Sequence, residues 1–209
     1  MALFRIGRER EHTSVLRGEG VFLRPPVMDD FPAWAALREE SRDFLTPWEP
    51  SWPADDLTRA AFRRRIKRQT EEIAREESAP YFIFRQTDGV LLGGLTIGQI
   101  RRGFAQTASI GYWMGLPHAG RGYMSRAVRA AASHAFANMR LHRLEAACLP
   151  TNEASIRALE SVGFRREGLA RAYLRINGRW RDHLLFALLE NDPPPAARRR
   201  NLAPQRDCP

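Results

Sequence analysis

A glycine-rich turn stands between two segments of different periodicity. Gly120-Arg121-Gly122 follows the run 108–114, which has the β-branched and aromatic residues of a strand, and precedes the run 124–136, whose apolar residues recur with helical spacing. Glycines let a backbone approach a ligand closely, and the unpaired N–H groups of a first helical turn attract anions. The turn therefore predicts a phosphate-binding site, the alternative being a tight turn that only starts a helix.

The candidate ligand-binding residues lie at the end of the strand, in the turn and in the first helical turn. They are Trp113, Met114, Gly120, Arg121, Gly122, Tyr123, Met124, Ser125 and Arg126. Backbone N–H groups from about Arg121 to Arg126 would hold the phosphates, and these two arginines could add charge or lie on a solvated helix face. The turn is not a P-loop, because no Gly-Lys-Ser/Thr follows, and it lacks the third glycine of a Rossmann fingerprint.

A second block of motifs follows in the same half of the chain. Residues 144–150 have the composition of a strand, and residues 151–162 have the pattern of a short helix that stops at Gly163. Asn152 stands where it can cap this helix with its side-chain oxygen. Ser155 lies on the same first turn, where it could face a ligand or solvent.

These blocks together resemble the GNAT acyl-CoA N-acyltransferases. Residues 119–124 are similar to the family's central motif Gln/Arg-x-x-Gly-x-Gly/Ala, although Ala119 and Met124 depart from it. The spacing Asn-x-x-Ser, a helix and then Gly-Phe-x-x-Glu-Gly continues the resemblance. Segments 44–53 and 173–183 are similar to the RimJ/RimL group of ribosomal-protein-alanine N-acetyltransferases, so the likeness covers roughly residues 20–190.

The resemblance implies an α/β (α+β) GNAT fold, in which helices flank a mixed, mostly antiparallel sheet of about seven strands. A splayed strand pair would hold acetyl-CoA as co-substrate, and a neutral amine would attack its thioester directly. Asn152 would then also bind the pantetheine arm. Leu159 stands where many members carry the tyrosine that protonates the thiolate, so Ser155 becomes the candidate thiol partner, ahead of Tyr173.

The proton acceptor is less well marked by the sequence. Glu49, in Trp48-Glu49-Pro50, could hold the acceptor ammonium or be an exposed loop charge, and Glu167 could be catalytic or structural. An α-amine has a pKa near 7.7–8.0, so ordered water could also accept the proton.

The acceptor is expected to be the N-terminal α-amine, Ala or Ser, of a protein, most plausibly a ribosomal protein. The net charge of +9 and the arginines 63, 64, 65 and 68, expected opposite Phe62 and Ile66, raise the hypothesis of ribosome or RNA contact. The preference for arginine over lysine in this chain would be explained equally by genome composition. The alternatives are a GNAT enzyme acting on a small amine or antibiotic, and a non-catalytic RNA or ribosome-assembly module.

Composition also bounds the class of protein. No window approaches a membrane span and residues 1–5 lack a secretory pattern, so we expect a cytoplasmic protein without membrane contact. Neither the two cysteines nor the five histidines have disulfide or metal-ligand spacing, so no metal is expected. Residues 1–192 should form one domain and the Pro/Arg-rich residues 193–209 a disordered tail. No particular oligomeric state is predicted.

Periodicity places the remaining elements. Strands are expected at 21–25, 81–85, 90–97 and up to residue 114, and helices from Asp29 or Asp30 to about 40 and from 55 to 76. Asn177-Gly178 predicts a type I′ turn between strands 173–176 and 183–189.

Overall fold

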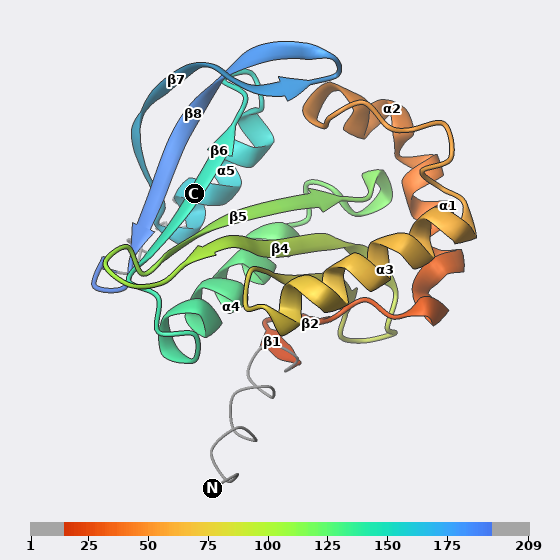
Figure 1. The fold of residues 1–209 in the computed structure, drawn as a ribbon, viewed down its shortest axis with the longest axis horizontal. Coiled ribbons are helices and arrows are strands. Elements are labelled where there is room, and N and C mark those ends of the chain that lie inside the picture. Colours follow the sequence, from red (N-terminus) through yellow and green to blue (C-terminus); the bar gives the residue numbers. More distant parts are fainter. Residues whose placement is uncertain (1–14, 194–209) are drawn as a thin grey trace, which may run out of the picture.

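The chain folds around one eight-stranded sheet. The computed structural model describes residues 15–193, and its strand order is β1-β2-β3-β4-β5-β6-β8-β7 (Figure 1). Every neighbouring pair is antiparallel except β5 and β6, which run parallel. The expected mixed α/β architecture is confirmed, with one strand more than the predicted seven. The extra strand is β1, whose three residues are too few to show a period.

The described residues form strands, α-helices and short 3₁₀ turns with the following bounds. The strands are β1 Leu16–Gly18, β2 Val21–Arg24, β3 Ala79–Arg85, β4 Leu91–Arg101, β5 Thr107–Met114, β6 Arg143–Cys148, β7 Arg165–Ile176 and β8 Arg179–Leu189. The α-helices are α1 Phe31–Glu40, α2 Arg42–Leu45, α3 Arg59–Ala74, α4 Tyr123–Ala137 and α5 Glu153–Val162. Short 3₁₀ turns cover Met28–Asp30, Thr46–Trp48 and Leu116–His118.

Helices bury both faces of the sheet. On one face α4 packs its small buried residues, among them Ala127 and Ala131, against the strands of the main core. On the other face α1 and α3 enclose a second, aromatic cluster, in which the rings of Trp34 and Phe62 lie 4.8 Å apart between centroids. Figure 1 shows α3 and α4 on opposite sides of the sheet. Apolar contact on both faces therefore fixes the central strands.

Two predicted boundaries are wrong for identifiable reasons. Helix α3 begins at Arg59 rather than 55, because Thr58 caps it: the Thr58 hydroxyl accepts the N–H of Ala61 at 3.1 Å. The β7–β8 hairpin begins at Arg165, well before 173, since β7 is largely exposed and shows little apolar alternation. Its turn is as predicted, with φ of 43° at Asn177 and 76° at Gly178.

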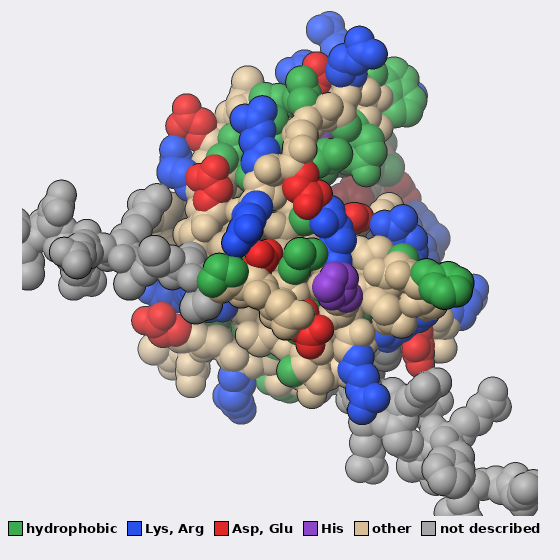
Figure 2. Space-filling model, turned by 90° about the vertical axis from the view of Figure 1, so that its left-hand side faces the viewer, with side chains coloured by type: hydrophobic (Ala, Val, Ile, Leu, Met, Phe, Trp, Pro, Cys, Tyr) green, Lys and Arg blue, Asp and Glu red, His purple; other side chains and the backbone are tan. Residues whose placement is uncertain are grey.

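The expected arginine cluster on α3 is only partly correct. Arg65 points inward rather than opposite Phe62, and it contacts Asp56. Arg64 and Arg68 form ion pairs with acidic neighbours. On the face drawn in Figure 2, blue basic side chains are interspersed with red acidic ones.

The sheet opens between its two parallel strands. β5 and β6 pair only over Thr107–Ser109 and Arg143–Glu145, and beyond these residues the strands have no ladder contact. β6 continues instead along β8 as far as Cys148. The predicted splayed strand pair is thus present, and the edge of β5 from Ile110 onward faces a gap. Among the described residues no helix is long and apolar enough to cross a membrane, and residues 194–209 of the predicted tail lie outside the described part.

Candidate active site

A large cavity lies where β5 and β6 separate. Its volume is about 1020 Å³, and its walls come from β5, the turn before α4, β6, α5, the segment before Pro50 and the end of β7. The backbone N–H of Asn177 donates to the carbonyl of Glu49 at 3.0 Å and so joins the hairpin to the opposite wall. Glu49, Ser155, Asn152 and most of the predicted cofactor-binding residues line this cavity, whereas Arg121, Arg126 and the alternative candidates Glu167 and Tyr173 do not.

The glycine turn presents free N–H groups to the cavity. Gly120 and Gly122 have φ of 73° and 76°, in the left-handed region that glycine adopts without strain. Gly122 caps α4 without any side-chain hydrogen bond, and within residues 15–193 the N–H groups of residues 123–125 have no protein acceptor. Arg121 is exposed, and the Arg126 guanidinium lies 5.7 Å from the ring centroid of Tyr123. The arginines therefore flank the turn rather than line the cavity.

Asn152 performs its capping role and retains a free donor. Its Oδ1 accepts the N–H of Ser155 at 3.1 Å, which starts α5. Its side-chain nitrogen has no hydrogen-bond partner in the part of the chain that the structure describes, and the residue lines the large cavity. The two interpretations of Asn152 are compatible in this geometry.

Ser155 has a partner that the sequence did not reveal. Its Oγ lies 2.9 Å from the hydroxyl of Tyr112, a residue of β5, and either oxygen can donate. Burial raises the pKa of Tyr112 above its ordinary value, although the hydrogen bond to Ser155 opposes this shift. Leu159, in contrast, is 1% exposed and packs in the core. The phenol beside Ser155 therefore comes from β5 and not from α5.

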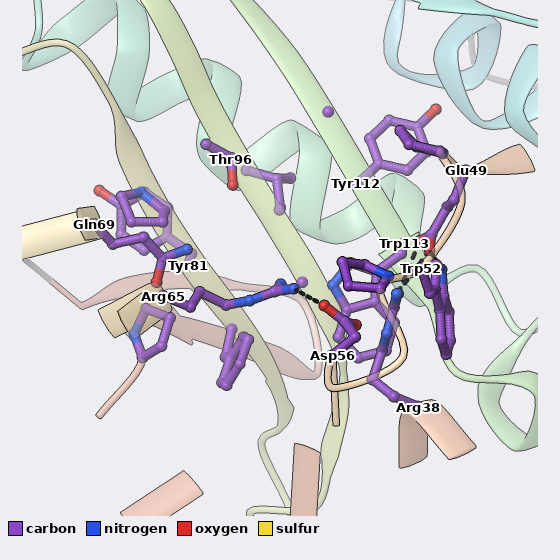
Figure 3. A pocket seen from close by; sticks show the side chains of 18 of the residues that line it. Arg38, Glu49, Trp52, Asp56, Arg65, Gln69, Tyr81, Thr96, Tyr112 and Trp113 are labelled. Atoms are coloured by element: carbon purple, nitrogen blue, oxygen red, sulfur yellow. Dashed lines mark hydrogen bonds and ion pairs between the residues drawn. The ribbon is translucent and has the colours of Figure 1, made fainter. Parts of the chain in front are cut away.

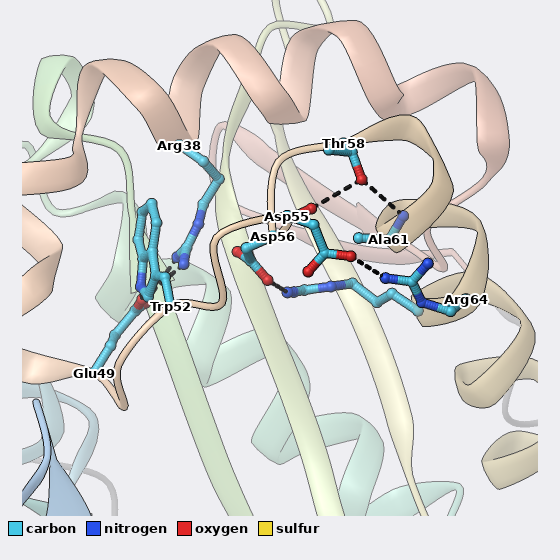
Figure 4. A network of polar contacts seen from close by, with 9 residues as sticks. Arg38, Glu49, Trp52, Asp55, Asp56, Thr58, Ala61 and Arg64 are labelled. Atoms are coloured by element: carbon cyan, nitrogen blue, oxygen red, sulfur yellow. Dashed lines mark hydrogen bonds and ion pairs between the residues drawn. The ribbon is translucent and has the colours of Figure 1, made fainter.

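Glu49 is held firmly rather than exposed. Nη1 and Nη2 of Arg38 donate to its two carboxylate oxygens at 2.8 and 2.7 Å, and Nε1 of Trp52 donates to Oε2 at 2.8 Å (Figure 4). The Arg38 guanidinium also lies 4.0 and 4.9 Å from the ring centroids of Trp52 and Trp113. Since a carboxylate has about four acceptor positions, Glu49 keeps roughly one for a ligand.

The other predicted base does not reach the cavity. Glu167 is exposed, does not line the large cavity, and accepts from Arg143 Nη1 at 2.9 Å. This hydrogen bond lowers the pKa of Glu167. Tyr173, the alternative thiol partner, is 46% exposed and is also absent from the lining of the large cavity.

His183 is a functional candidate that sequence reasoning considered only as a metal ligand. It is 3% exposed and lines the large cavity. Its Nδ1 lies 2.9 Å from the carbonyl oxygen of Arg181. Because a carbonyl only accepts, Nδ1 carries the hydrogen, and Nε2 of the neutral ring carries the lone pair. No cluster of three or more possible metal ligands occurs in residues 15–193.

A smaller cavity of about 430 Å³ lies on the α3 side of β5 (Figure 3). It shares five lining residues with the large cavity: Glu49, Pro50, Gly111, Tyr112 and Trp113. Its far wall includes Arg65 and Gln69 of α3. The two cavities therefore meet at β5 and at the carboxylate of Glu49.

Comparison with known proteins decides the family. The profile described as "Acetyltransferase (GNAT) domain" matches residues 21–165, which include the glycine turn and α5. The chain belongs to the GNAT acetyltransferase family. It is an N-acetyltransferase with the fold that the resemblance implied.

Relatives of this GNAT enzyme include ribosomal-protein acetyltransferases. It is 38% identical over 178 residues to the probable N-acetyltransferase YjcK of Bacillus subtilis, covering 85% of this chain and 98% of the relative. It is 33% identical over 169 residues to the ribosomal protein uS5-alanine N-acetyltransferase of Escherichia coli, covering 79% and 87%. Mycobacterium smegmatis RimJ, solved in complex with CoA-disulfide, is similar with a TM-score of 0.79 at 35% identity, covering 85% and 86%.

Proposed function

We propose that this GNAT enzyme transfers the acetyl group of acetyl-CoA to the N-terminal α-amine of a protein that begins with Ala or Ser, in particular a ribosomal protein. The observation that carries the proposal is the junction at Glu49, where a cavity for a long cofactor meets a second cavity on the acceptor side. The Escherichia coli relative is named for acting on alanine of a ribosomal protein, which supports this acceptor. A cytoplasmic location follows from the proposed acceptor.

The large cavity fits acetyl-CoA in both charge and hydrogen bonding. The free N–H groups of residues 123–125 would bind the pyrophosphate, with Arg121 and Arg126 adding positive charge nearby. The open edge of β5 offers backbone groups to the amides of the pantetheine arm, because only its other edge is paired along residues 110–114. The side-chain nitrogen of Asn152 supplies a further donor.

The residues at the junction divide the chemistry between them. Glu49 holds the acceptor ammonium, and the neutral amine then attacks the thioester carbonyl carbon, so a C–N bond forms and the C–S bond breaks. Ser155 donates a hydrogen bond to the departing sulfur and is oriented by Tyr112, which remains protonated because burial raises its pKa. The ammonium first loses one proton to solvent, and the nitrogen loses a second proton as the C–N bond forms; this second proton is passed on to the departing thiolate. The products are therefore an amide, the CoA thiol and one proton released to solvent.

His183 is the proposed proton acceptor for the attacking amine. Within the large cavity Glu49 is paired with Arg38 and Glu153 with Arg157, so neither carboxylate is an unencumbered base. The other histidine, His118, stands beside the phosphate-binding turn rather than at the junction. His183 therefore offers a basic nitrogen outside any ion pair, and ordered water is the alternative acceptor.

The test uses a basic peptide that begins with Ala or Ser and contains one internal lysine. Incubation with acetyl-CoA and fragmentation by mass spectrometry should place the acetyl group on the α-amine. Acetyl on the lysine alone would contradict the N-terminal assignment. Rapid turnover of a polyamine or aminoglycoside without peptide acetylation would establish a small-amine acceptor instead.

A further inference from the structure

Arg65 brings an incompletely paired cation to the smaller cavity. Its only acceptor among the described residues is Asp56, at 3.3 Å from Nη2 to Oδ1 (Figure 3). A guanidinium has five N–H donors, so most of those of Arg65 lack an acceptor. The side chain is 30% exposed, and burial lowers its pKa in spite of Asp56. This cation is thus held in place without being neutralised.

Arg38 and Arg64 are paired more closely with carboxylates than Arg65, whose guanidinium also lies 5.0 Å from the ring centroid of Trp34. Arg38, across the cavity, makes two short hydrogen bonds to Glu49 and lies between two indoles. Arg64 is tightly paired with Asp55 on the exposed side of α3. Figure 3 shows Arg65 reaching across the cavity toward Asp56. The smaller cavity therefore contains one guanidinium that a carboxylate holds through both terminal nitrogens, and a second, Arg65, whose single acceptor lies at 3.3 Å.

Gln69 adds a second unsatisfied group on the same wall. It lies four residues after Arg65, which places both on one face of α3. Its Oε1 is buried and has no hydrogen-bond partner within residues 15–193. Because an amide presents both an acceptor and two donors, Gln69 can bind either the N–H or the C=O groups of a ligand. The wall is therefore built for a polar occupant.

The floor between Glu49 and this wall is open to a polypeptide. Gly111 of β5 lines both cavities, and a Cβ added there would meet nothing within 4 Å. An extended chain advances about 3.3–3.6 Å per residue. A peptide whose amine lies at Glu49 would therefore carry its second or third side chain into the smaller cavity.

We propose that the smaller cavity is a specificity site that binds a carboxylate side chain at the second or third position of the acceptor polypeptide, with Arg65 as the recognising cation. This inference rests on the proposed function. A carboxylate would supply the bidentate acceptor that Asp56 does not provide. A lysine at the same position would meet Arg65 as a like charge.

The test compares kcat/KM for two sets of otherwise identical peptides that begin with Ala. The second residue is Glu, Gln or Lys in the first set, and the third residue is Glu, Gln or Lys in the second set. The wild-type enzyme should prefer Glu over Lys by about tenfold or more at one of these positions, the effect expected of one hydrogen bond between charged groups. Arg65→Met should reduce the ratio to about twofold, mainly through KM. Asp56→Asn should increase it, because Arg65 then loses its competing partner.

Arg64→Met is the matched control, since it removes an arginine from the adjacent, exposed position and should keep the wild-type ratio. Equal kcat/KM for all three peptides, or an equal loss in Arg64→Met, would overturn the specificity site while leaving α-amine acetylation established. Absence of any α-acetylated peptide would overturn the proposed function itself. The melting temperature and the KM for acetyl-CoA identify variants that fail to fold. If Arg65→Met fails to fold, the Glu/Lys ratio of kcat/KM measured for Asp56→Asn decides the proposal.

Discussion

Arg38 and Glu49 form a bidentate ion pair that joins α1 to the wall shared by the two cavities. The two hydrogen bonds measure 2.8 and 2.7 Å, and the side chains are only 6% and 20% exposed. A pair buried to this degree stabilises little on balance, but removing one partner leaves an uncompensated charge. The pair thus fixes where the carboxylate stands in the candidate site.

Arg38→Met should lower the free energy of unfolding by about 3 kcal/mol, because Glu49 then remains buried without its cation. Urea denaturation measures this change. The control is Arg42→Met, which removes an exposed partner of Glu39 and should leave the urea midpoint nearly unchanged. Equal midpoints for the two variants would show that the buried pair does not hold the wall.

Glu49→Gln should raise the KM for an Ala- or Ser-starting peptide more than it lowers kcat. The amide keeps the shape of the side chain but loses the charge that would bind the acceptor ammonium, and Arg38 still has an oxygen to contact. Steady-state kinetics with saturating acetyl-CoA separate the two constants, and Glu39→Gln controls for surface charge. A fall in kcat with unchanged KM would assign Glu49 to chemistry instead of binding.

Gly122→Asp should abolish the rise in melting temperature that acetyl-CoA produces, since a carboxylate would stand against the pyrophosphate. Differential scanning calorimetry with and without the cofactor measures the effect. Gly103→Asp is the matched control, because Gly103 has a φ of 67° and equally open surroundings but lies in the turn between β4 and β5. Retention of the full shift in Gly122→Asp would remove the phosphate assignment.

Local pattern and resemblance predicted most elements, the splayed strands and the glycine turn that lines the large cavity, but not the contacts between distant segments. Tyr112 follows the alternation of β5 and shares its inward face with Ile110, so its sequence position indicates only a core residue. The opening of β5 from β6 brings its hydroxyl to Ser155. Nothing in either segment alone indicates that pairing.

The sequence did contain an unused signal for Arg38. It lies four residues after Trp34 and therefore on the buried face of α1. A charged residue on an apolar helix face requires a partner, which the structure supplies as Glu49. The missed part of β7 has no comparable signal, because residues 165–172 carry one large apolar side chain, Leu169, and lie along a largely exposed strand.

Ser155→Ala should lower kcat by roughly 10- to 1000-fold with little change in acetyl-CoA binding, the range expected for one transition-state donor. Tyr112→Phe should lower kcat less, since it removes only the partner of Ser155. The double variant should lose little beyond Ser155→Ala, because both act on the same sulfur. An intact kcat in Ser155→Ala, or additive losses in the double variant, would show that Ser155 and Tyr112 do not act as a unit.

His183→Ala should lower kcat/KM by about 100-fold, the lower range for a general base, and added imidazole should restore part of it. His142→Ala, an exposed histidine that lines neither cavity, is the control. Full activity in His183→Ala, without any response to imidazole, would assign proton acceptance to water.

In the wild-type enzyme kcat/KM should rise with pH as the α-amine, with a pKa near 7.7–8.0, loses its proton. No descending limb should appear below about pH 9, because burial raises the pKa of Tyr112 above its ordinary value of 10 and keeps the phenol protonated there.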